Sequence, residues 1–359
     1  MKYKIIKISA LLISVLLLCS CGNTKLVRTK EITNKITQTT VITKSDITEN
    51  EDFKAFFKEF KADFTIPGLL EGVIPQGIAY LGSINAFAIT GYYEEGAFPS
   101  VIMLVDAETN KLTKYFPLQN VDESDYLGHA GGITASEDYV YITSERTCNI
   151  FEIDALEQTQ NGKAIKFESN FKLNTTGAFT CYNDGVLWVG DFIEADDEAR
   201  ESVEFITTLP SGETFYAYCE GYALKDGLPD IKAINSESNG YVPDYMLAIP
   251  EQVQGMAFTH TGKIIFTTSF GRRNNSQLNI YDDVLVSDRA GTRTIDDVEI
   301  DVLACSSALL TDEITAPPMA EGITSVDNYV FMIFESGADK YRAHRGKYPT
   351  DTAFKGIIE

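Results

Sequence analysis

The sequence lacks most of the signatures on which common enzyme classes depend. It has three His and one Trp in 359 residues, which excludes a histidine-rich metal centre. It contains no G-x-S-x-G, H-E-x-x-H, P-loop or G-x-G-x-x-G motif, so nothing points to a serine hydrolase, a zinc peptidase or a nucleotide-binding enzyme. Basic residues are also scarce: 30 Lys and Arg against 52 Asp and Glu give a formal net charge of −22. Phosphate backbones repel so acidic a chain, which excludes sequence-independent nucleic-acid binding.

Long apolar runs are missing except at the N-terminus. Residues 1–20 have a basic start and then an apolar run from Ile8 to Leu18, which suits a signal peptide and is too short to span a bilayer. The next residues, Leu18-Cys19-Ser20-Cys21, resemble the lipobox of bacterial lipoproteins, in which the last thiol receives the lipid. We therefore expect residues 1–20 to be a lipoprotein signal peptide and Cys21 to anchor the chain in the cell membrane, facing outside the cytoplasm. An ordinary secretory signal cut nearby is the alternative.

Cysteine is otherwise rare. Four thiols remain, at Cys148, Cys181, Cys219 and Cys305, and their spacing matches no zinc motif. Outside the cytoplasm they could pair, but Cys148 and Cys181 lie in stretches that resemble strands. Disulfides and buried free thiols both remain open.

Two segments separate the signal from the main domain. Residues 21–50 are rich in Thr and Lys and are expected to be a polar tether that begins at the lipidated Cys21. Residues 51–64 carry five Phe on one face of a helical pattern, with Thr48 or Asn50 as a possible cap. We expect an amphipathic helix that packs on the domain. A membrane-surface helix is less favoured because its polar face has mixed charge.

From residue 65 to residue 359 the chain repeats one pattern. A glycine, a short apolar strand, a turn, a β-branched and aromatic strand and a polar stop recur five times, with lead glycines at Gly77, Gly132, Gly177, Gly255 and Gly322. A second hairpin follows in most repeats, as expected of four-stranded propeller blades. The sequence predicts an all-β fold, a β-propeller with five blades, or six if the longest interval hides one. A strand from about residues 64–73 is expected to complete the last blade.

Several of these segments resemble those of an uncharacterised family of secreted or lipid-anchored bacterial β-propeller proteins. They are Pro75–Tyr80, Gly128–Ile133, Val253–Phe258, Pro317–Ile323 and Phe334–Ala338. More distantly, the pattern resembles gluconolactonase and strictosidine-synthase propellers. That resemblance implies a channel metal held by carboxylates and Asn, and it makes Glu321 the candidate metal ligand here. The matching positions Gln76 and Gln254 depart from that set.

Antiparallel strands bring two sets of polar residues to one mouth of the channel. Residues that enter the first strand of each repeat and residues that leave the second strand lie on the same face of the disc. The predicted ligand-binding residues are Gln76, Tyr92, His129, Glu145, Asp191, Gln254, Arg272, Glu321 and Glu335. Arg272 could also simply pair with Glu321 or Glu335. The acidic run from Glu194 to Glu201 is a weaker candidate for Ca²⁺, because it lacks EF-hand spacing.

Two functions follow from this arrangement. The favoured hypothesis is a membrane-anchored module that binds a small ligand, a glycan or a protein partner at the polar mouth. The alternative is a metal-dependent hydrolase, with Ca²⁺ as the candidate ion, that acts on a lactone, ester or glycosidic bond at the same place. The sequence identifies no catalytic residue, and no cofactor other than Ca²⁺ is expected.

Overall fold

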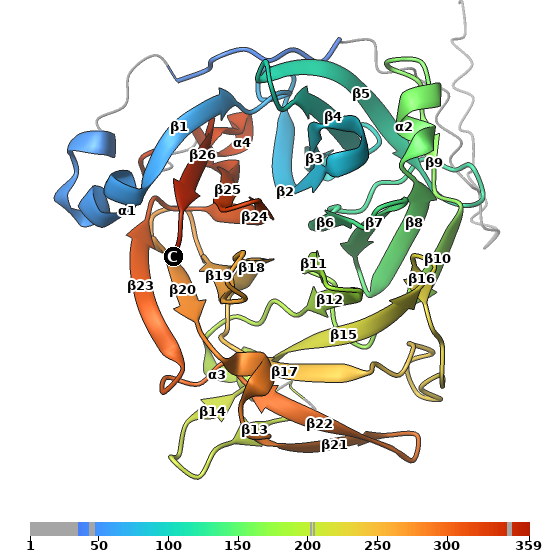
Figure 1. The fold of residues 1–359 in the computed structure, drawn as a ribbon. Helices are drawn as coiled ribbons and strands as arrows, with labels where there is room; N and C mark the ends of the chain where they lie inside the picture. The colour runs from blue at the N-terminus through green and yellow to red at the C-terminus, as the bar shows by residue number, and fades with distance from the viewer. Residues whose placement is uncertain (1–34, 43–46, 202, 204, 343–346) are drawn as a thin grey trace, which may run out of the picture.

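The chain folds into a ring of β-sheets around a central axis (Figure 1). The computed structural model describes residues 35–42, 47–201, 203, 205–342 and 347–359. Five strands lie nearest the axis and contact one another in a closed ring: β2 (Val73–Leu81), β6 (Gly132–Ala135), β11 (Phe179–Asn183), β18 (Val253–Phe258) and β24 (Ala320–Val326). The predicted all-β propeller is therefore confirmed.

Each inner strand forms an antiparallel hairpin with the strand that follows it. The second strands are β3 (Ala86–Tyr93), β7 (Tyr139–Ser144), β12 (Val186–Gly190), β19 (Ile264–Thr268) and β25 (Tyr329–Phe334). Between β11 and β12, Asp184 and Gly185 form a two-residue turn with φ angles of 47° and 78°. Positive φ at both positions matches the twist of a tight hairpin, and Asp and Gly tolerate it well.

Four sheets in the described part of the chain have the strand order of a regular blade. Their outer strands are β4 (Val101–Asp106) with β5 (Lys111–Gln119), β8 (Thr147–Glu152) with β10 (Ser169–Lys172), β20 (Ser276–Tyr281) with β23 (Leu310–Ala316), and β26 (Thr352–Ile357) with β1 (Phe60–Thr65). Short β9 (Ile165–Lys166) adds to β5 in parallel. Four regular blades are found where the sequence predicts five blades, or six, because the third repeat enters a larger sheet.

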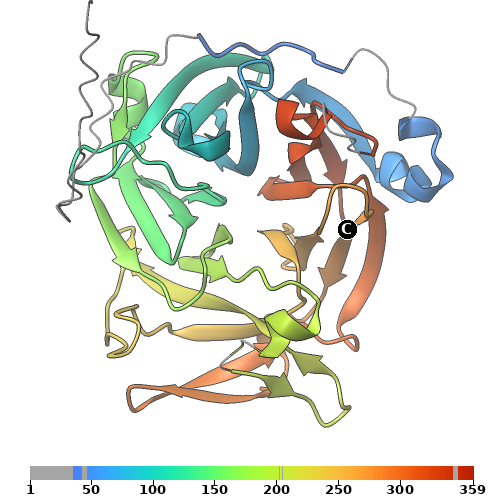
Figure 2. The same cartoon turned by 180° about the vertical axis from the view of Figure 1, so that it is seen from behind.

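That larger sheet has seven strands. It runs β11-β12-β15-β17-β22-β21, with β16 (Leu228–Pro229) beside β15 (Ala217–Lys225). Strand β17 (Tyr245–Ile249) pairs in parallel with β22 (Val298–Ala304), which forms a hairpin with β21 (Gly291–Ile295). This hairpin lies between β20 and β23 in the chain, so the long interval after Gly255 carries an insertion onto the neighbouring sheet. The hairpin projects from the ring in Figures 1 and 2.

The ring closes through its N-terminal strand. Strand β1 is the outer strand of the last sheet, where Phe60 lies opposite Gly356 of β26. The sequence places a closing strand at about residues 64–73, but the structure places it at Phe60–Thr65, and β2 begins at Val73. Closure by a strand from the opposite end of the chain ties the two ends of the domain together.

The helix expected over residues 51–64 is much shorter. It consists of the 3₁₀ turn η2 (Glu51–Phe53) and α1 (Lys54–Glu59), after which the chain becomes β1. Asn50 caps the turn, since its Oδ1 accepts a hydrogen bond from Asp52 N at 3.1 Å. Phe56 and Phe60 are buried and stack with ring centroids 4.8 Å apart, within the cluster that includes Phe354 of the last sheet.

Much of the expected tether lies on the domain rather than away from it. Ile36 and Ile47 are buried, and Gln38 Nε2 donates to the carbonyl oxygens of Thr65 and Asn110 at 2.8 and 3.0 Å. The predicted signal peptide, Cys21 and residues 22–34 lie outside the described residues. Within the residues described, no helix is long and apolar enough to cross a membrane.

The remaining elements of the described chain are short. The other turns, helices and strands are η1 (Ile47–Glu49), η3 (Gly82–Ile84), η4 (Glu94–Gly96), α2 (Asp154–Gln158), α3 (Asp197–Glu201), β13 (Thr207–Thr208), β14 (Thr214–Phe215), η5 (Val284–Val286), η6 (Glu335–Gly337) and α4 (Asp339–Arg342).

The four thiols in the described part of the chain are unpaired. Cys148, Cys181, Cys219 and Cys305 are free and buried, which resolves the choice between disulfides and free thiols that the sequence leaves open. Burial raises the pKa of the Cys181 thiol to about 12, so it is a poor nucleophile.

Candidate functional site

A cavity of about 500 Å³ lies where the inner strands begin and the second strands end. Six of the nine residues proposed from the sequence line it: Gln76, Tyr92, His129, Glu145, Gln254 and Glu335. The sequence argument missed Ser144, Phe192 and Tyr341, which also line it. The repeat therefore brings polar side chains from distant parts of the chain to one mouth of the channel.

A pair of carboxyl groups lies at the cavity: Glu335 lines it, whereas Glu321, which the sequence also proposed, is not part of the lining. Glu321, at the start of β24, is buried with 4% of its surface exposed, and its carboxyl group is hydrogen-bonded to that of Glu335. Burial, and then the negative charge of Glu335, raises the pKa of Glu321 well above its usual value. Burial also raises the pKa of Glu335 to about 7. Two carboxyl groups this close share a proton at neutral pH, with Glu321 the more strongly protonated of the two.

Three other side chains hold Glu335 in place. Gln76 Nε2 donates to Glu335 Oε2 at 3.3 Å, and Tyr341 lies close enough to this carboxyl group to lower its pKa. Tyr92 lies beside Tyr341 in turn. Burial and the charge of Glu335 raise the pKa of Tyr92 to about 12, so both tyrosines stay protonated at neutral pH.

Backbone strain marks the opposite side of the mouth. Glu145 and Arg146 join β7 to β8 as a two-residue turn, with φ angles of 51° and 59°. Neither residue type favours a positive φ, in contrast to the Asn-Gly or Asp-Gly of common hairpins. Both side chains are exposed and line the cavity, and Arg146 Nη1 donates to the carbonyl oxygen of Asn174 at 2.5 Å.

Asp191 does not line the cavity as the sequence proposed. Its Oδ1 accepts a hydrogen bond from Thr176 N at 2.6 Å, and burial raises the pKa of its carboxyl group. The carboxylate therefore fixes the loop that enters β11, while the next residue, Phe192, faces the cavity. Aspartate side chains commonly satisfy backbone N–H groups in this way, so sequence alone could not distinguish the two roles.

Arg272 is likewise outside the cavity lining. Its guanidinium lies 5.0 Å from the ring centroid of Tyr341. The expected pairing with a glutamate of the channel is not found among the ion pairs of the described residues. Lys340 also lies over this ring, at 5.3 Å, and its Nζ is 3.5 Å from the Tyr92 hydroxyl.

Neighbouring inner strands approach one another closely at Gly322. A Cβ atom on Gly322 would lie 2.7 Å from Ile78 N, in the neighbouring inner strand. Glycine is needed there because the backbones approach too closely for any side chain. A smaller cavity of about 220 Å³ is lined by residues that include His260 and Asp327, near the far ends of the inner strands. The two cavities share none of their lining residues.

The residues present do not fit the metal that the resemblance implies. Within the described residues, no group of three or more His, Cys, Asp or Glu is arranged to hold a metal ion. The carboxyl groups of Glu321 and Glu335 are hydrogen-bonded to each other, and the side-chain amide of Gln76 turns an N–H group toward them. The assignment of Glu321 as a metal ligand is therefore not supported by this geometry.

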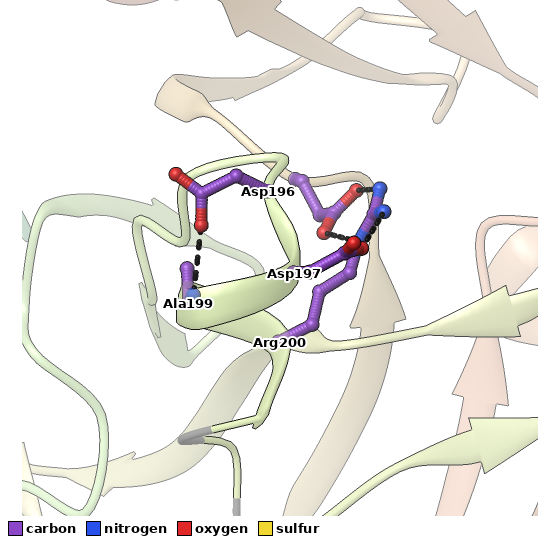
Figure 3. Close-up of polar contacts among 5 residues, drawn as sticks. Asp196, Asp197, Ala199 and Arg200 are labelled. Atoms are coloured by element: carbon purple, nitrogen blue, oxygen red, sulfur yellow. Dashed lines mark hydrogen bonds and ion pairs between the residues drawn. The ribbon is translucent and has the colours of Figure 1, made fainter.

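The acidic run considered for Ca²⁺ folds into a short helix (Figure 3). Asp196 Oδ1 accepts a hydrogen bond from Ala199 N at 2.8 Å and so caps the first turn of α3. Arg200 forms a bidentate pair with Glu251, with both N–O distances 2.8 Å, and lies 3.8 Å from Asp197. Capping and ion pairing account for Asp196 and Asp197, and no group of three or more acids in the described residues is arranged to hold a cation.

No family model and no curated protein matches this chain. Similar solved structures include a glutaminyl cyclase of Myxococcus xanthus, with 10% identity and a TM-score of 0.43. The match covers 84% of this chain and 97% of the cyclase chain. The PQQ-bound aldose sugar dehydrogenase of Streptomyces coelicolor has 13% identity and a TM-score of 0.42, with coverage of 84% and 98%. A putative gluconolactonase has 11% identity and a TM-score of 0.32, with coverage of 84% and 94%. The predicted distant likeness to gluconolactonase propellers is thus found, and at these TM-scores it carries no argument about activity.

Proposed function

We propose that this chain is a lipid-anchored, extracytoplasmic propeller that binds a small ligand, or the end of a glycan or protein chain, at the polar mouth of its channel. The observation that carries the proposal is the cavity of about 500 Å³, in which six of the predicted residues converge. That volume is within the range of small-molecule sites, and the polar groups lie beside the rings of Tyr92, Phe192 and Tyr341.

The anchor and the blade count belong to the same proposal. Lipidation at Cys21 follows from the lipobox-like sequence alone. We count the seven-stranded sheet as a fifth, extended blade, because its first strands β11, β12, β15 and β17 are antiparallel neighbours like those of the other sheets.

Ligand-observed NMR on the full chain in detergent tests the proposal, with a mixture of neutral sugars, short peptides, organic acids and amines. His129→Ala alters the mouth that carries the cavity, and His260→Ala makes the same change at the opposite mouth. We expect the first variant to weaken binding of any hit by about tenfold and the second to leave it unchanged. Equal effects of both variants, or no hit at all, would contradict the proposal.

A hydrolase remains the second candidate, because the carboxyl pair has a group poised to exchange protons near neutral pH. Burial places the pKa of Glu335 at about 7, where a general acid or base works best. Turnover of lactone or ester substrates by the purified chain, and its loss in Glu335→Gln, would favour this candidate over simple binding.

A further inference from the structure

The base of the cavity carries negative charge that no cation balances directly. No ion pair of the described residues includes Glu321 or Glu335. The hydrogen-bonding partners of Glu335 are neutral, and Lys340 lowers the pKa of its carboxyl group through its charge without forming an ion pair with it. With Glu321 protonated and the pKa of Glu335 at about 7, the pair carries up to one negative charge near neutral pH, in a poorly hydrated place.

Two nearby cations lie on aromatic rings instead, and Arg146, which also lines the cavity, donates to the carbonyl oxygen of Asn174. Lys340 Nζ lies 5.7 Å from the ring centroid of Tyr92 and 5.3 Å from that of Tyr341, and Arg272 lies 5.0 Å from the latter. These contacts show that the rings beside the cavity attract positive charge. They also leave the oxygens of Glu335 available to a cation that enters from the cavity.

We infer that the cavity recognises a protonated amine of its ligand, held against Glu335 and beside the rings of Tyr92 and Tyr341. The inference rests on the proposed binding function and names the chemical class of the ligand. An ammonium group supplies N–H donors and a positive charge, which complement acceptor oxygens and ring faces. A neutral hydroxyl group would satisfy a hydrogen bond but would leave the charge uncompensated.

An organic ammonium fits better than a metal ion. Ca²⁺ requires about six to eight oxygen ligands, whereas the base of the cavity offers two carboxyl groups that are hydrogen-bonded to each other. The cavity of about 500 Å³ also has room for the rest of an organic molecule. The wall formed by Ser144, Thr176 and Gln254 supplies hydrogen-bonding groups for that remainder.

The test compares probes of matched shape and different charge. The affinities of 1,4-diaminobutane and 1,4-butanediol are measured on the full chain in detergent, by titration at neutral pH. We expect the diamine to bind at least about tenfold more tightly than the diol, as a charge-assisted hydrogen bond requires. Similar affinity for both would overturn the amine inference while leaving a neutral ligand for the cavity possible.

Variants separate this site from general attraction to an acidic protein. Glu335→Gln should weaken the affinity for the diamine by at least about tenfold. Asp327→Asn, at the opposite mouth, makes the same change in net charge and should leave the affinity unchanged. Glu321→Gln keeps the charge of Glu335 and should retain binding, which also guards against loss of fold. Equal losses in Glu335→Gln and Asp327→Asn would overturn the inference. Failure of every probe and of the wider mixture would overturn the binding function itself.

Discussion

Two glutamates determine the chemistry of the channel mouth. Glu321 enters the innermost strand and Glu335 leaves the next one, so the hairpin of a single repeat brings their carboxyl groups together. Burial raises the pKa of both carboxyl groups, although the charge of Lys340 opposes this effect at Glu335, and the pair therefore keeps at least one proton at neutral pH. The net charge of the two carboxyl groups therefore depends on pH, and they lie where the proposed ligand would bind.

The pair should make the folded state less stable as the pH rises. The pKa of Glu335 is about 7 in the folded chain, against a usual value of 4.5, so its stabilising contribution is fully present below about pH 4.5 and is lost through pH 7. Between pH 5 and pH 8, the free energy of unfolding should fall by about 2 kcal/mol more in the unmodified chain than in Glu335→Gln. Urea denaturation at the two pH values measures the difference. Glu145→Gln, at the exposed rim, serves as the control, and an unchanged pH dependence in Glu335→Gln would refute the shared-proton arrangement.

One glycine makes a close approach between inner strands testable. A Cβ on Gly322 would meet Ile78 N at 2.7 Å and Gln76 O at 2.9 Å, and backbone atoms cannot move aside cheaply. Gly322→Ala should lower the free energy of unfolding by about 2 kcal/mol, as overpacking does. Gly291→Ala is the matched control, because no atom lies within 4 Å of its added Cβ, and its effect should stay within about 0.5 kcal/mol. Equal denaturation midpoints for the two variants would show that the axis is not crowded.

At the scale of elements, the repeats were predictable and the segment before them was not. A glycine followed by two apolar strands predicts each inner hairpin, because local turn chemistry and alternation specify it. The Phe series fits a helix up to Phe60, but Phe64 follows four residues later, a spacing that suits both a helix face and one face of a strand. The long-range pairing of β1 with β26 decided between them, and sequence periodicity carries no information on that pairing.

The site was predictable to the extent that the repeat builds it. Gln76 and Glu335 occupy repeated positions, so the ring geometry predicts that they meet. Tyr341 lies in the short helix α4, after the last repeated position, and no periodic signal leads to it. Asp191 occupies a repeated position, yet it bonds to the backbone of Thr176 instead of facing the cavity. The backbone hairpin recurs along this chain, whereas the role of each side chain depends on its local hydrogen bonds.

Closure of the ring should depend on the aromatic packing of β1. Phe60 is fully buried, stacks on Phe56 and covers Gly356, where a Cβ would lie 2.7 Å from its ring. Phe60→Ala should cost about 4 kcal/mol of unfolding free energy through the cavity it leaves. Phe270→Ala removes the same atoms from a side chain that is 41% exposed and should cost less than about 1 kcal/mol. Comparable losses in urea denaturation would mean that β1 adds little to closure.

At the scale of the whole molecule, net charge bears on the proposed membrane anchor. The net charge of −22 opposes contact with anionic headgroups, so the proposed anchor would have to hold the chain at a membrane without help from the protein surface. Residues 35–42 lie against the domain through Gln38 and through Asp351, whose carboxylate accepts from the backbone N–H groups of Val41 and Ile42 at 2.7 and 3.0 Å. Residues 35–42 therefore do not act as the free tether that the composition of residues 21–50 predicts.

The lipid anchor makes a prediction that the first residues of the chain can test. Cys21→Ala removes the thiol that would carry the lipid, whereas Cys19→Ala changes a neighbouring cysteine that the lipobox does not require. In a bacterial host with lipoprotein processing, the unmodified chain and Cys19→Ala should sediment with membranes, and Cys21→Ala should lose most of that association, because no apolar span replaces the anchor among the described residues. Fractionation followed by mass analysis of the N-terminal peptide measures both location and lipid. Equal membrane association of the two variants, with no lipid on Cys21, would mean that residues 1–20 act as an ordinary signal or that another surface holds the chain.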